Sequence, residues 1–476
     1  MDYDAIVIGA GLGGLTAGAL LAKRGKKVLL VEQHHHPGGC AVTFRRRDFT
    51  VEVGLHVMDG LDKGDPKREI FRELGVFDHV EFVRVPEFYR FTNGRIDIVI
   101  PDGYERASRV LTERFPHEKE GIAKYFKVLR GIQDEVKRLP REAWKFIALL
   151  PVFPFIFKNL IFREKATVGH FLDTIIRDDD LKLVLLANLG YYHDDPYTLS
   201  LIFYAVAQGS YFSGGGHYVK GGSQKLSDYL LDVIRSSGGE VLLRHLVTDI
   251  IMKDNRAIGI RYRKTKGEEA DREEAYGRAI VANASIPSVA RDLLPRREGG
   301  TLMTTVDKLA IAPSLTSVYL GFKKPVRELG NRCYSTFLFD GEVRTLADMT
   351  RNRREDYEKR NFAFVDYSQI DSGLAPEGKS LGAIVTLDYL AEWESLDGDT
   401  YREKKERVAK TCIDRLDALV PGVKEQVEYQ EVATPKTIKR FTLNPGGTAY
   451  GFAQIPEQAG RKRMQLKSPV GNLYFA

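Results

Sequence analysis

The chain has 476 residues, of which 43% are hydrophobic and 29% are charged, a composition typical of a globular protein large enough for two domains. The 71 basic residues exceed the 65 acidic residues only slightly, which gives a formal net charge of +6 at pH 7. Because so mild an excess provides no extended basic surface, it argues against a nucleic-acid partner.

The N-terminal residues show the strand–glycine–helix–strand order of a dinucleotide-binding unit. Residues 5–8 predict a short apolar strand, residues 15–24 an Ala- and Leu-rich helix, and residues 28–31 a second strand. The glycines between strand and helix have GxGxxG spacing, which permits a tight turn, close approach of a pyrophosphate, and packing of the helix on the sheet. The free N–H groups of the helix attract the pyrophosphate. The predicted cofactor-binding loop consists of Gly9, Ala10, Gly11, Leu12, Gly13 and Gly14.

The residues after the second strand favour FAD over NAD. Glu32 lies 18 residues after Gly14, where a carboxylate accepts hydrogen bonds from a ribose 2′-hydroxyl and repels a 2′-phosphate. A second glycine pair, Gly38 and Gly39, follows almost at once and suits another close approach of a long, extended dinucleotide. We therefore predict an FAD site that includes Glu32, Gly38 and Gly39.

Further along the chain, residues 65–74 and 121–139 predict helices. Residues 82–100 alternate between apolar and polar side chains and predict a β-hairpin that turns at Asn93-Gly94.

Residues 144–162 are apolar and aromatic. Pro151 and Pro154 break a straight helix, and two lysines interrupt the stretch, which argues against a transmembrane span. The basic residues that flank or punctuate it are Arg141, Lys145, Lys158 and Arg163. Such a segment suits a bilayer interface, so we expect peripheral contact with a membrane. The alternative is a buried element beside a substrate cavity.

The second half of the chain predicts an aromatic region followed by mixed helices and strands. Residues 186–218 contain eight tyrosines and phenylalanines, which suit either an ordinary core or a long apolar tunnel for a planar hydrocarbon. The predicted strands are residues 240–243, 247–253, 257–262, 279–283, 314–322 and 380–387, and the predicted helices are residues 227–235 and 401–420.

Several segments resemble one superfamily of flavoproteins. The positions that carry the resemblance are residues 9–14, 32, 38–39, 53–56, 220–226, 236–251, 279–285, 434–437 and 447–451. They resemble the FAD-binding halves of amine oxidases and phytoene desaturases. Within that superfamily they are most similar to bacterial phytoene desaturases, carotenoid isomerases and retinol saturases.

The resemblance implies an α/β fold, in which a Rossmann-like FAD-binding domain is interwoven with an α+β substrate domain. The implied FAD-binding parts are residues 1–75, 215–300 and 431–476, and the implied substrate-domain parts are residues 76–214 and 301–430. The resemblance also implies that Val247 contacts the adenine end of FAD through its backbone. Gly471 begins a motif whose glycine-rich continuation holds FAD in the family, so we expect a chain that ends at Ala476 to hold FAD weakly.

The implied activity is that of an FAD-dependent oxidoreductase acting on the C–C or C=C bonds of an apolar polyene or isoprenoid. The sequence shows no Ser/His/Asp constellation, CxxC pair or HExxH motif, as expected where the flavin supplies the chemistry. Desaturation, saturation and isomerisation all remain open, and we assign no catalytic residue; His56 is interpreted as a structural hydrogen-bonding residue. The alternatives are a flavin amine oxidase and a non-redox isoprenoid carrier similar to GDP-dissociation inhibitors.

Cysteine and histidine usage indicates the compartment and argues against a metal site. Cys40, Cys333 and Cys412 lack the spacing of metal ligands and fit a reducing compartment. No signal peptide precedes the first predicted strand, so a cytoplasmic location with peripheral membrane contact is expected. The three consecutive histidines at 34–36 cannot easily face one ion and are interpreted as a solvated loop.

Overall fold

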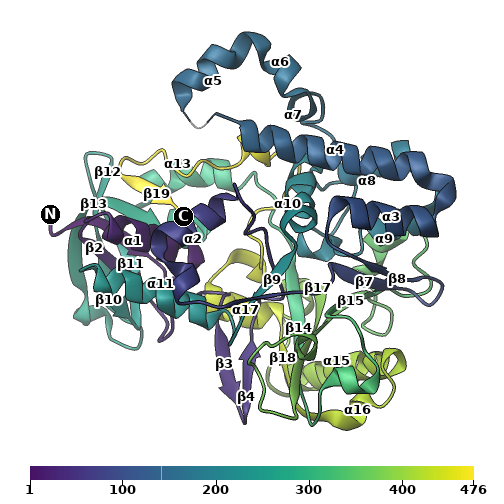
Figure 1. Cartoon of the computed structure of the whole chain (residues 1–476). Coiled ribbons are helices and arrows are strands. Elements are labelled where there is room, and N and C mark those ends of the chain that lie inside the picture. Colours follow the sequence, from purple (N-terminus) through teal and green to yellow (C-terminus); the bar gives the residue numbers. More distant parts are fainter. Residues whose placement is uncertain (141) are drawn as a thin grey trace.

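Two large sheets organise the protein in the computed structural model, which describes residues 1–140 and 142–476 (Figure 1). The first sheet has the strand order β10-β2-β1-β13-β12-β11, and β19 also pairs with β13. Its strands are β1 (Tyr3–Ile8), β2 (Val28–Glu32), β10 (Glu240–Leu243), β11 (His245–Lys253), β12 (Arg256–Lys264), β13 (Glu273–Ala282) and β19 (Leu473–Phe475). The strands β10, β2, β1, β13 and β19 pair in parallel, as in a Rossmann-like sheet.

Alternation along β1 explains how this sheet is covered on both faces. Val7 faces the helices α1 (Leu12–Lys23), α2 (Pro66–Leu74) and α11 (Gln224–Ser236), where it shares a buried cluster with Leu15 and Ile234. Its neighbours Ile6 and Ile8 face the opposite side and pack with residues of β11, β12 and α13 (Arg296–Val306). A strand that is buried on both faces has a continuous run of apolar residues in its sequence, as residues 5–8 do.

The second sheet has the order β18-β14-β17-β16-β15-β7-β8, and its pairs are antiparallel except β15 with β7. Its strands are β7 (Tyr89–Thr92), β8 (Asp97–Ile100), β14 (Ser314–Phe322), β15 (Ser335–Leu338), β16 (Phe362–Asp366), β17 (Ser380–Asp388) and β18 (Val427–Ala433). One face packs on α15 (Gly398–Leu419), with Phe322 and Phe364 against Leu416. Residues that alternate with these, such as Tyr319 and Val365, point to the other face.

A helical layer lies against the β7–β8 end of the second sheet (Figure 1). Its helices are α3 (Tyr104–Arg114), α4 (Lys119–Arg138), α8 (Val168–Ile175), α9 (Asp179–Leu185), α10 (Leu201–Gly214) and α14 (Leu346–Asn352). Aromatic residues predicted as core or tunnel lie here; Tyr204, for example, is buried and donates to Leu185 O over 2.9 Å.

Smaller elements complete the structure. They are the hairpin of β3 (Thr43–Arg46) and β4 (Phe49–Glu52), the three-stranded sheet of β5 (Met58–Asp59), β9 (Gly216–Val219) and β6 (Phe82–Arg84), and the helices α12 (Ile286–Ser288), α16 (Val423–Gln426) and α17 (Pro435–Thr442).

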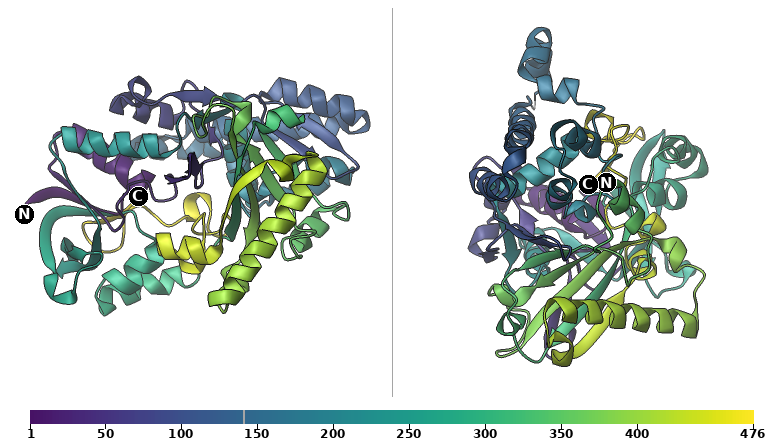
Figure 2. Two further views of the ribbon diagram at one scale, coloured as in Figure 1. Left: turned by 90° about the horizontal axis from the view of Figure 1, so that it is seen from below. Right: turned by 90° about the vertical axis from the view of Figure 1, so that its right-hand side faces the viewer.

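The predicted α/β fold with an interwoven second domain is confirmed, because segments distant in sequence alternate between the two sheets (Figure 2). The proposed domain boundaries stay predictions. The predicted hairpin over residues 82–100 is wrong in its first part: β6 pairs with β9, and only β7 and β8 form the hairpin across Asn93-Gly94. Pro86 lies between β6 and β7 and has no N–H to continue a ladder, which explains the separation.

A short helical arm follows α4 and projects beyond the rest of the molecule (Figure 1). It consists of α5 (Ala143–Leu149), α6 (Phe153–Ile156) and α7 (Lys158–Phe162). Arg141, which we expected to flank this stretch, lies outside the described residues. Within residues 1–140 and 142–476, no helix combines the length and the apolar character needed to span a bilayer.

A buried carboxylate joins two of these strands to the helix α11. Glu52, at the end of β4, is 1% exposed and accepts from Ser223 N (2.8 Å), Ser223 Oγ (2.7 Å) and Tyr218 OH (3.0 Å). The N–H of Leu55 adds a further donor at 3.2 Å. Because Ser223 begins α11 and Tyr218 lies on β9, one side chain links β4, β9 and the start of α11.

We predict that Glu52→Ala destabilises the protein by more than about 2 kcal/mol, because several buried donors lose their acceptor at once. The free energy of unfolding is measured by urea titration. Glu69→Ala is the matched control: Glu69 is an exposed carboxylate that pairs with Arg72 at 2.6 Å, and its loss should cost less than about 1 kcal/mol. Equal unfolding midpoints for the two variants would contradict the prediction.

Candidate functional site

The glycine loop after β1 is shaped by close backbone contacts. Gly9 has a φ of 92°, a left-handed value that favours glycine, and its N–H donates to Val31 O over 2.8 Å. A Cβ on Gly11 would lie 2.5 Å from the side-chain amide of Asn283, and a Cβ on Gly14 would collide with Gly9 O. All three glycines of the GxGxxG pattern therefore occupy positions with no room for a side chain.

The start of α1 presents backbone donors that no side chain satisfies. Gly11 is the N-cap residue and makes no side-chain cap hydrogen bond, while Gly13 in the first turn is exposed. The N–H groups of Leu12 and Gly13 thus face outward at the positive end of a helix of 12 residues. This arrangement suits an anionic group such as a pyrophosphate.

Glu32 lies at the end of β2, beside this loop, and is 7% exposed. Its Oε2 accepts from Ala10 N over 2.7 Å and its Oε1 accepts from His34 N over 2.8 Å. Two backbone donors hold the carboxylate in place, and each oxygen keeps a lone pair for a hydroxyl donor. The geometry fits a ribose hydroxyl as the further partner.

The second glycine pair packs directly on the first loop. The N–H of Gly38 donates to Ala10 O over 2.7 Å, and a bridge joins Gly38 to Gly11. Gly38 and Gly39 have φ values of 125° and 65°, and a Cβ on Gly39 would lie 3.2 Å from the Cα of Gly11. The glycine loop at residues 9–14 and the glycine pair at residues 38–39 are separated in sequence but thus form one surface.

Val247 lies on β11, where a register shift in the pairing with β12 falls between Val247 and Asp249. Its side chain belongs to the buried cluster that includes Leu29 and Val31 of β2. The position is thus close to the strand that carries Glu32, and a backbone contact with a nucleotide stays a prediction.

Asn283 is a site residue that the sequence analysis assigned no role. Its N–H donates to Ile8 O over 2.8 Å, and with the amide oriented by its hydrogen bonds it accepts from Gly11 N at 3.0 Å. The same amide donates to Ala476 O at 3.1 Å. The sequence could have indicated this residue, because Asn283 is a polar residue directly after a buried parallel strand. Ligands of such sheets bind beside the carboxyl ends of the strands.

Residues 53–56 are held by three tyrosines of the second domain. Tyr319 OH donates to Val53 O (2.9 Å), Tyr367 OH to Leu55 O (3.1 Å) and Tyr334 OH to His56 O (2.5 Å). We call residues 53–56 the clamped strip. Tyr319 lies on β14, Tyr334 directly precedes β15, and Tyr367 directly follows β16. The three hydrogen bonds therefore fix the strip to the second sheet.

His56 and Tyr191 form the polar contact at the end of the clamped strip. His56 Nδ1 lies 3.0 Å from Tyr191 OH, and the two rings are 5.6 Å apart. Burial lowers the pKa of His56 to about 4 and raises the pKa of Tyr191 well above its usual value. Both groups are therefore neutral near pH 7, which supports the interpretation of His56 as a hydrogen-bonding residue.

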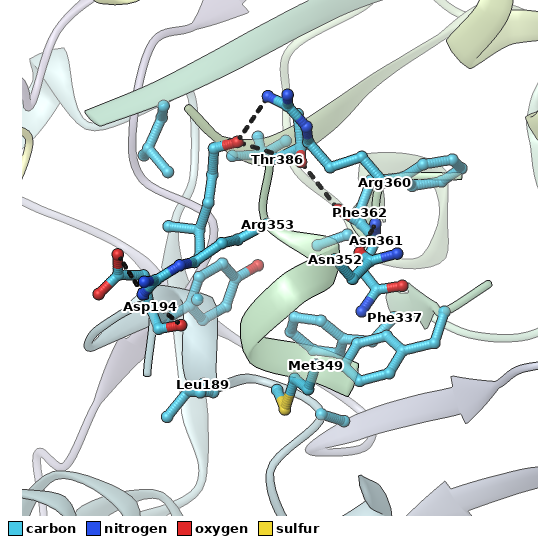
Figure 3. Close-up of a pocket in the computed structure, with 18 residues that line it drawn as sticks. Leu189, Asp194, Phe337, Met349, Asn352, Arg353, Arg360, Asn361, Phe362 and Thr386 are labelled. Carbon is cyan, nitrogen blue, oxygen red and sulfur yellow. Dashed lines mark hydrogen bonds and ion pairs between the residues drawn. The ribbon is translucent and has the colours of Figure 1, made fainter. Parts of the chain in front are cut away.

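A cavity with about 70 Å³ of free space begins at Tyr191 and extends over the second sheet (Figure 3). Its apolar walls come from the segment 187–191, from β15 and from α14, and they include Leu189, Phe337 and Met349. A second cavity, of about 260 Å³, lies beside Ala284, Tyr450 and Phe475, close to the end of β13.

Neither the cysteines nor the histidine run form a metal site in this arrangement. Within residues 1–140 and 142–476, no group of three His, Cys, Asp or Glu side chains is placed to hold an ion. His34 instead contacts Phe441 O through its Nε2 at 2.6 Å.

Comparisons with known proteins identify the family. The chain is 26% identical to an all-trans-retinol 13,14-reductase of Danio rerio, over 100% of this chain and 82% of that protein. It is 29% identical to a chloroplastic prolycopene isomerase of Daucus carota, over 94% of this chain and 72% of that protein. The crystal structure of an oxidoreductase from Methanosarcina mazei superposes with a TM-score of 0.62 at 17% identity, covering 99% of this chain and 94% of that one. The model of the flavin-containing amine oxidoreductase family matches residues 12–476, so the chain belongs to that family of flavin-dependent oxidoreductases.

Proposed function

We propose that the flavin of this enzyme is FAD and that it lies along the two glycine loops. The support is the combination of uncapped α1 donors, a fixed Glu32 carboxylate and the contact between Gly38 and Gly11. The pyrophosphate would lie at Leu12 and Gly13, and the adenosine ribose at Glu32. A mononucleotide flavin has no adenosine and would leave Glu32 without a ligand.

We further propose that the substrate is an apolar polyene or isoprenoid and that the reaction occurs at a C–C or C=C bond. The observation that carries this proposal is the aromatic, apolar cavity that starts at Tyr191, where the clamped strip ends. The relatives named for retinol and prolycopene support the same class of substrate.

When bound, a flavin supplies hydride acceptance or donation at carbon, and the protein supplies binding, orientation and a dry environment. The apolar walls exclude water, and the neutral pair of His56 and Tyr191 provides a hydrogen-bonding position without adding charge. These features fit a substrate that has no charged group at its reacting carbons.

An absorption spectrum and anaerobic reduction of the purified protein test this function. We expect flavin bands, and we expect polyenes rather than primary amines to change the redox state of the flavin. Bleaching by amines alone would favour an amine oxidase, and a protein that binds polyenes but never binds flavin would favour a carrier.

We also propose that the helical arm of α5, α6 and α7 contacts the bilayer from which an apolar substrate is taken. Trp144, Phe155 and Phe162 on this arm are 67%, 82% and 78% exposed, although large apolar side chains are normally buried. Lys145 and Lys158 on the same arm are exposed and suit an anionic surface. Phe157, by contrast, is buried against Phe153 and belongs to the interior of the arm.

We predict that Gly11→Val abolishes FAD binding, because its Cβ would displace Asn283 and the loop that approaches the pyrophosphate. The measurement is the flavin-to-protein ratio after incubation with FAD and removal of the unbound cofactor. Gly300→Ala is the control, because a Cβ there meets nothing within 4 Å. Full FAD binding by Gly11→Val would show that this loop is not the site.

We predict that changing Trp144, Phe155 and Phe162 to Ser weakens binding to vesicles of phosphatidylserine and phosphatidylcholine at least tenfold. Each substitution removes the free energy gained when a large apolar side chain moves from water into the bilayer, which is about 1.5–3 kcal/mol for complete transfer. Vesicle flotation measures the effect. The control changes three exposed apolar residues outside the arm, Phe77, Val99 and Leu466, to Ser. If the unaltered protein does not float, or if both triple variants float equally, the arm is not a membrane contact.

A further inference from the structure

Asn283 lies against the glycine loop along most of its length. A Cβ on Gly9 would lie 2.8 Å from Asn283 O, and a Cβ on Gly14 would lie 2.9 Å from Asn283 Cβ. Cβ atoms on Gly11 and Gly13 would lie 2.5 Å and 2.8 Å from the two ends of its side-chain amide. One residue outside the loop therefore contacts all four of these glycines.

The hydrogen bonds of the Asn283 amide determine which end is oxygen and which is nitrogen. Gly11 N is a donor 3.0 Å from one end, and Ala476 O is an acceptor 3.1 Å from the other. The amide oxygen therefore faces Gly11, and the amide nitrogen faces Ala476 and lies beside Gly13. A neutral amide satisfies both partners, whereas a carboxylate, which has two acceptor oxygens, would satisfy only Gly11 N.

The amide nitrogen lies at the start of α1. Because Cα–Cβ bonds tilt toward the N-terminus of a helix, a group that would meet a Cβ on Gly13 lies at that end of the helix. The free N–H groups of Leu12 and Gly13 point in the same direction. An amide nitrogen carries two hydrogens, and Ala476 O accepts one of them. Among the described residues, the second hydrogen is left for an acceptor at the start of α1.

No cation within the glycine loop would compensate an added negative charge there. Residues 9–14 contain no charged side chain, so the loop can hold an anion only through N–H groups and the helix dipole. Glu32 already places one carboxylate beside the loop, where it accepts from Ala10 N over 2.7 Å. The charge of the group at position 283 therefore acts directly on any anion bound at this helix end.

We propose that the neutral amide of Asn283 both holds the glycine loop and donates its second hydrogen to the pyrophosphate of the cofactor. A carboxylate of the same shape would keep the bond from Gly11 N, but it would lose the donor and repel the pyrophosphate. The proposal rests on the FAD site proposed above and adds to it a residue outside both glycine segments.

Two substitutions separate the two parts of this role. Asn283→Ala removes both hydrogen bonds without adding charge, and we expect FAD to bind about tenfold more weakly at pH 8 and at pH 5.5. Asn283→Asp should bind FAD more weakly than Asn283→Ala at pH 8, because the carboxylate is ionised. Affinity is measured by titrating the protein into FAD and following the quenching of flavin fluorescence, and each value is divided by that of the unaltered protein at the same pH.

Lowering the pH provides a result that loss of structure alone would not give. The charge of a pyrophosphate raises the pKa of a carboxyl group beside it, and a protonated carboxyl group offers one donor and one acceptor, as the amide does. We therefore expect Asn283→Asp to bind FAD at least as tightly as Asn283→Ala at pH 5.5. A relative affinity of Asn283→Asp that is the same at both pH values would overturn the role of charge.

Asn93→Asp is the matched control. Asn93 lies in the turn between β7 and β8 of the second sheet, and its Oδ1 accepts from Ile96 N over 2.9 Å, a bond that aspartate keeps. We expect its affinity for FAD to equal that of the unaltered protein at both pH values. Circular dichroism verifies that each variant is folded, and if Asn283→Asp does not fold, full FAD affinity of Asn283→Ala still overturns the proposal.

The failure of this proposal differs from the failure of the FAD assignment. If the unaltered protein binds no FAD in the titration, both are overturned. If the unaltered protein and the two Asn283 variants bind FAD equally, only the role of Asn283 is wrong, and the FAD site stands.

Discussion

The packing of the glycine loop against Asn283 is the constraint on which the site depends. Asn283 follows β13, and its backbone N–H is bonded to Ile8 O while its side chain contacts Gly11. Because β1 and β13 are parallel neighbours, their carboxyl ends lie at the same edge of the sheet. The contacts of Asn283 hold the glycine loop against that edge. A side chain at Gly11 would lift the loop away, so the sheet itself determines where the uncapped start of α1 points.

The clamped strip fixes the position of the second sheet relative to the first. Glu52 fixes its beginning to α11, whose own position depends on the first sheet. The three tyrosine hydroxyls then donate to the carbonyls of Val53, Leu55 and His56, and the tyrosines lie on the face of the second sheet opposite α15. The cavity consequently starts at a defined place relative to the cofactor loops, at the contact of His56 with Tyr191.

The expectation of a cofactor site came from local sequence, whereas the cavity over the second sheet could not be anticipated in that way. The glycine loop, Glu32 and the pair Gly38-Gly39 lie within one short stretch, and their conformations follow from local sterics. The cavity is built from segments near 190, 337, 353 and 386, so no local spacing reveals it. The role of Phe157 was also hidden, because only the break between α6 and α7 turns it inward while its neighbours stay exposed.

The ionic groups around the cavity explain how charged residues can line a site for an apolar molecule. Arg360 and Asp388 are both almost fully buried, and each is compensated by several partners, so neither needs a ligand to offset its desolvation. They act as part of the wall, with the flat face of Arg360 also against the ring of Tyr357. Arg353 differs because Asp194 engages only one of its nitrogens and its side chain is 22% exposed, so its charge is balanced by one carboxylate together with solvent.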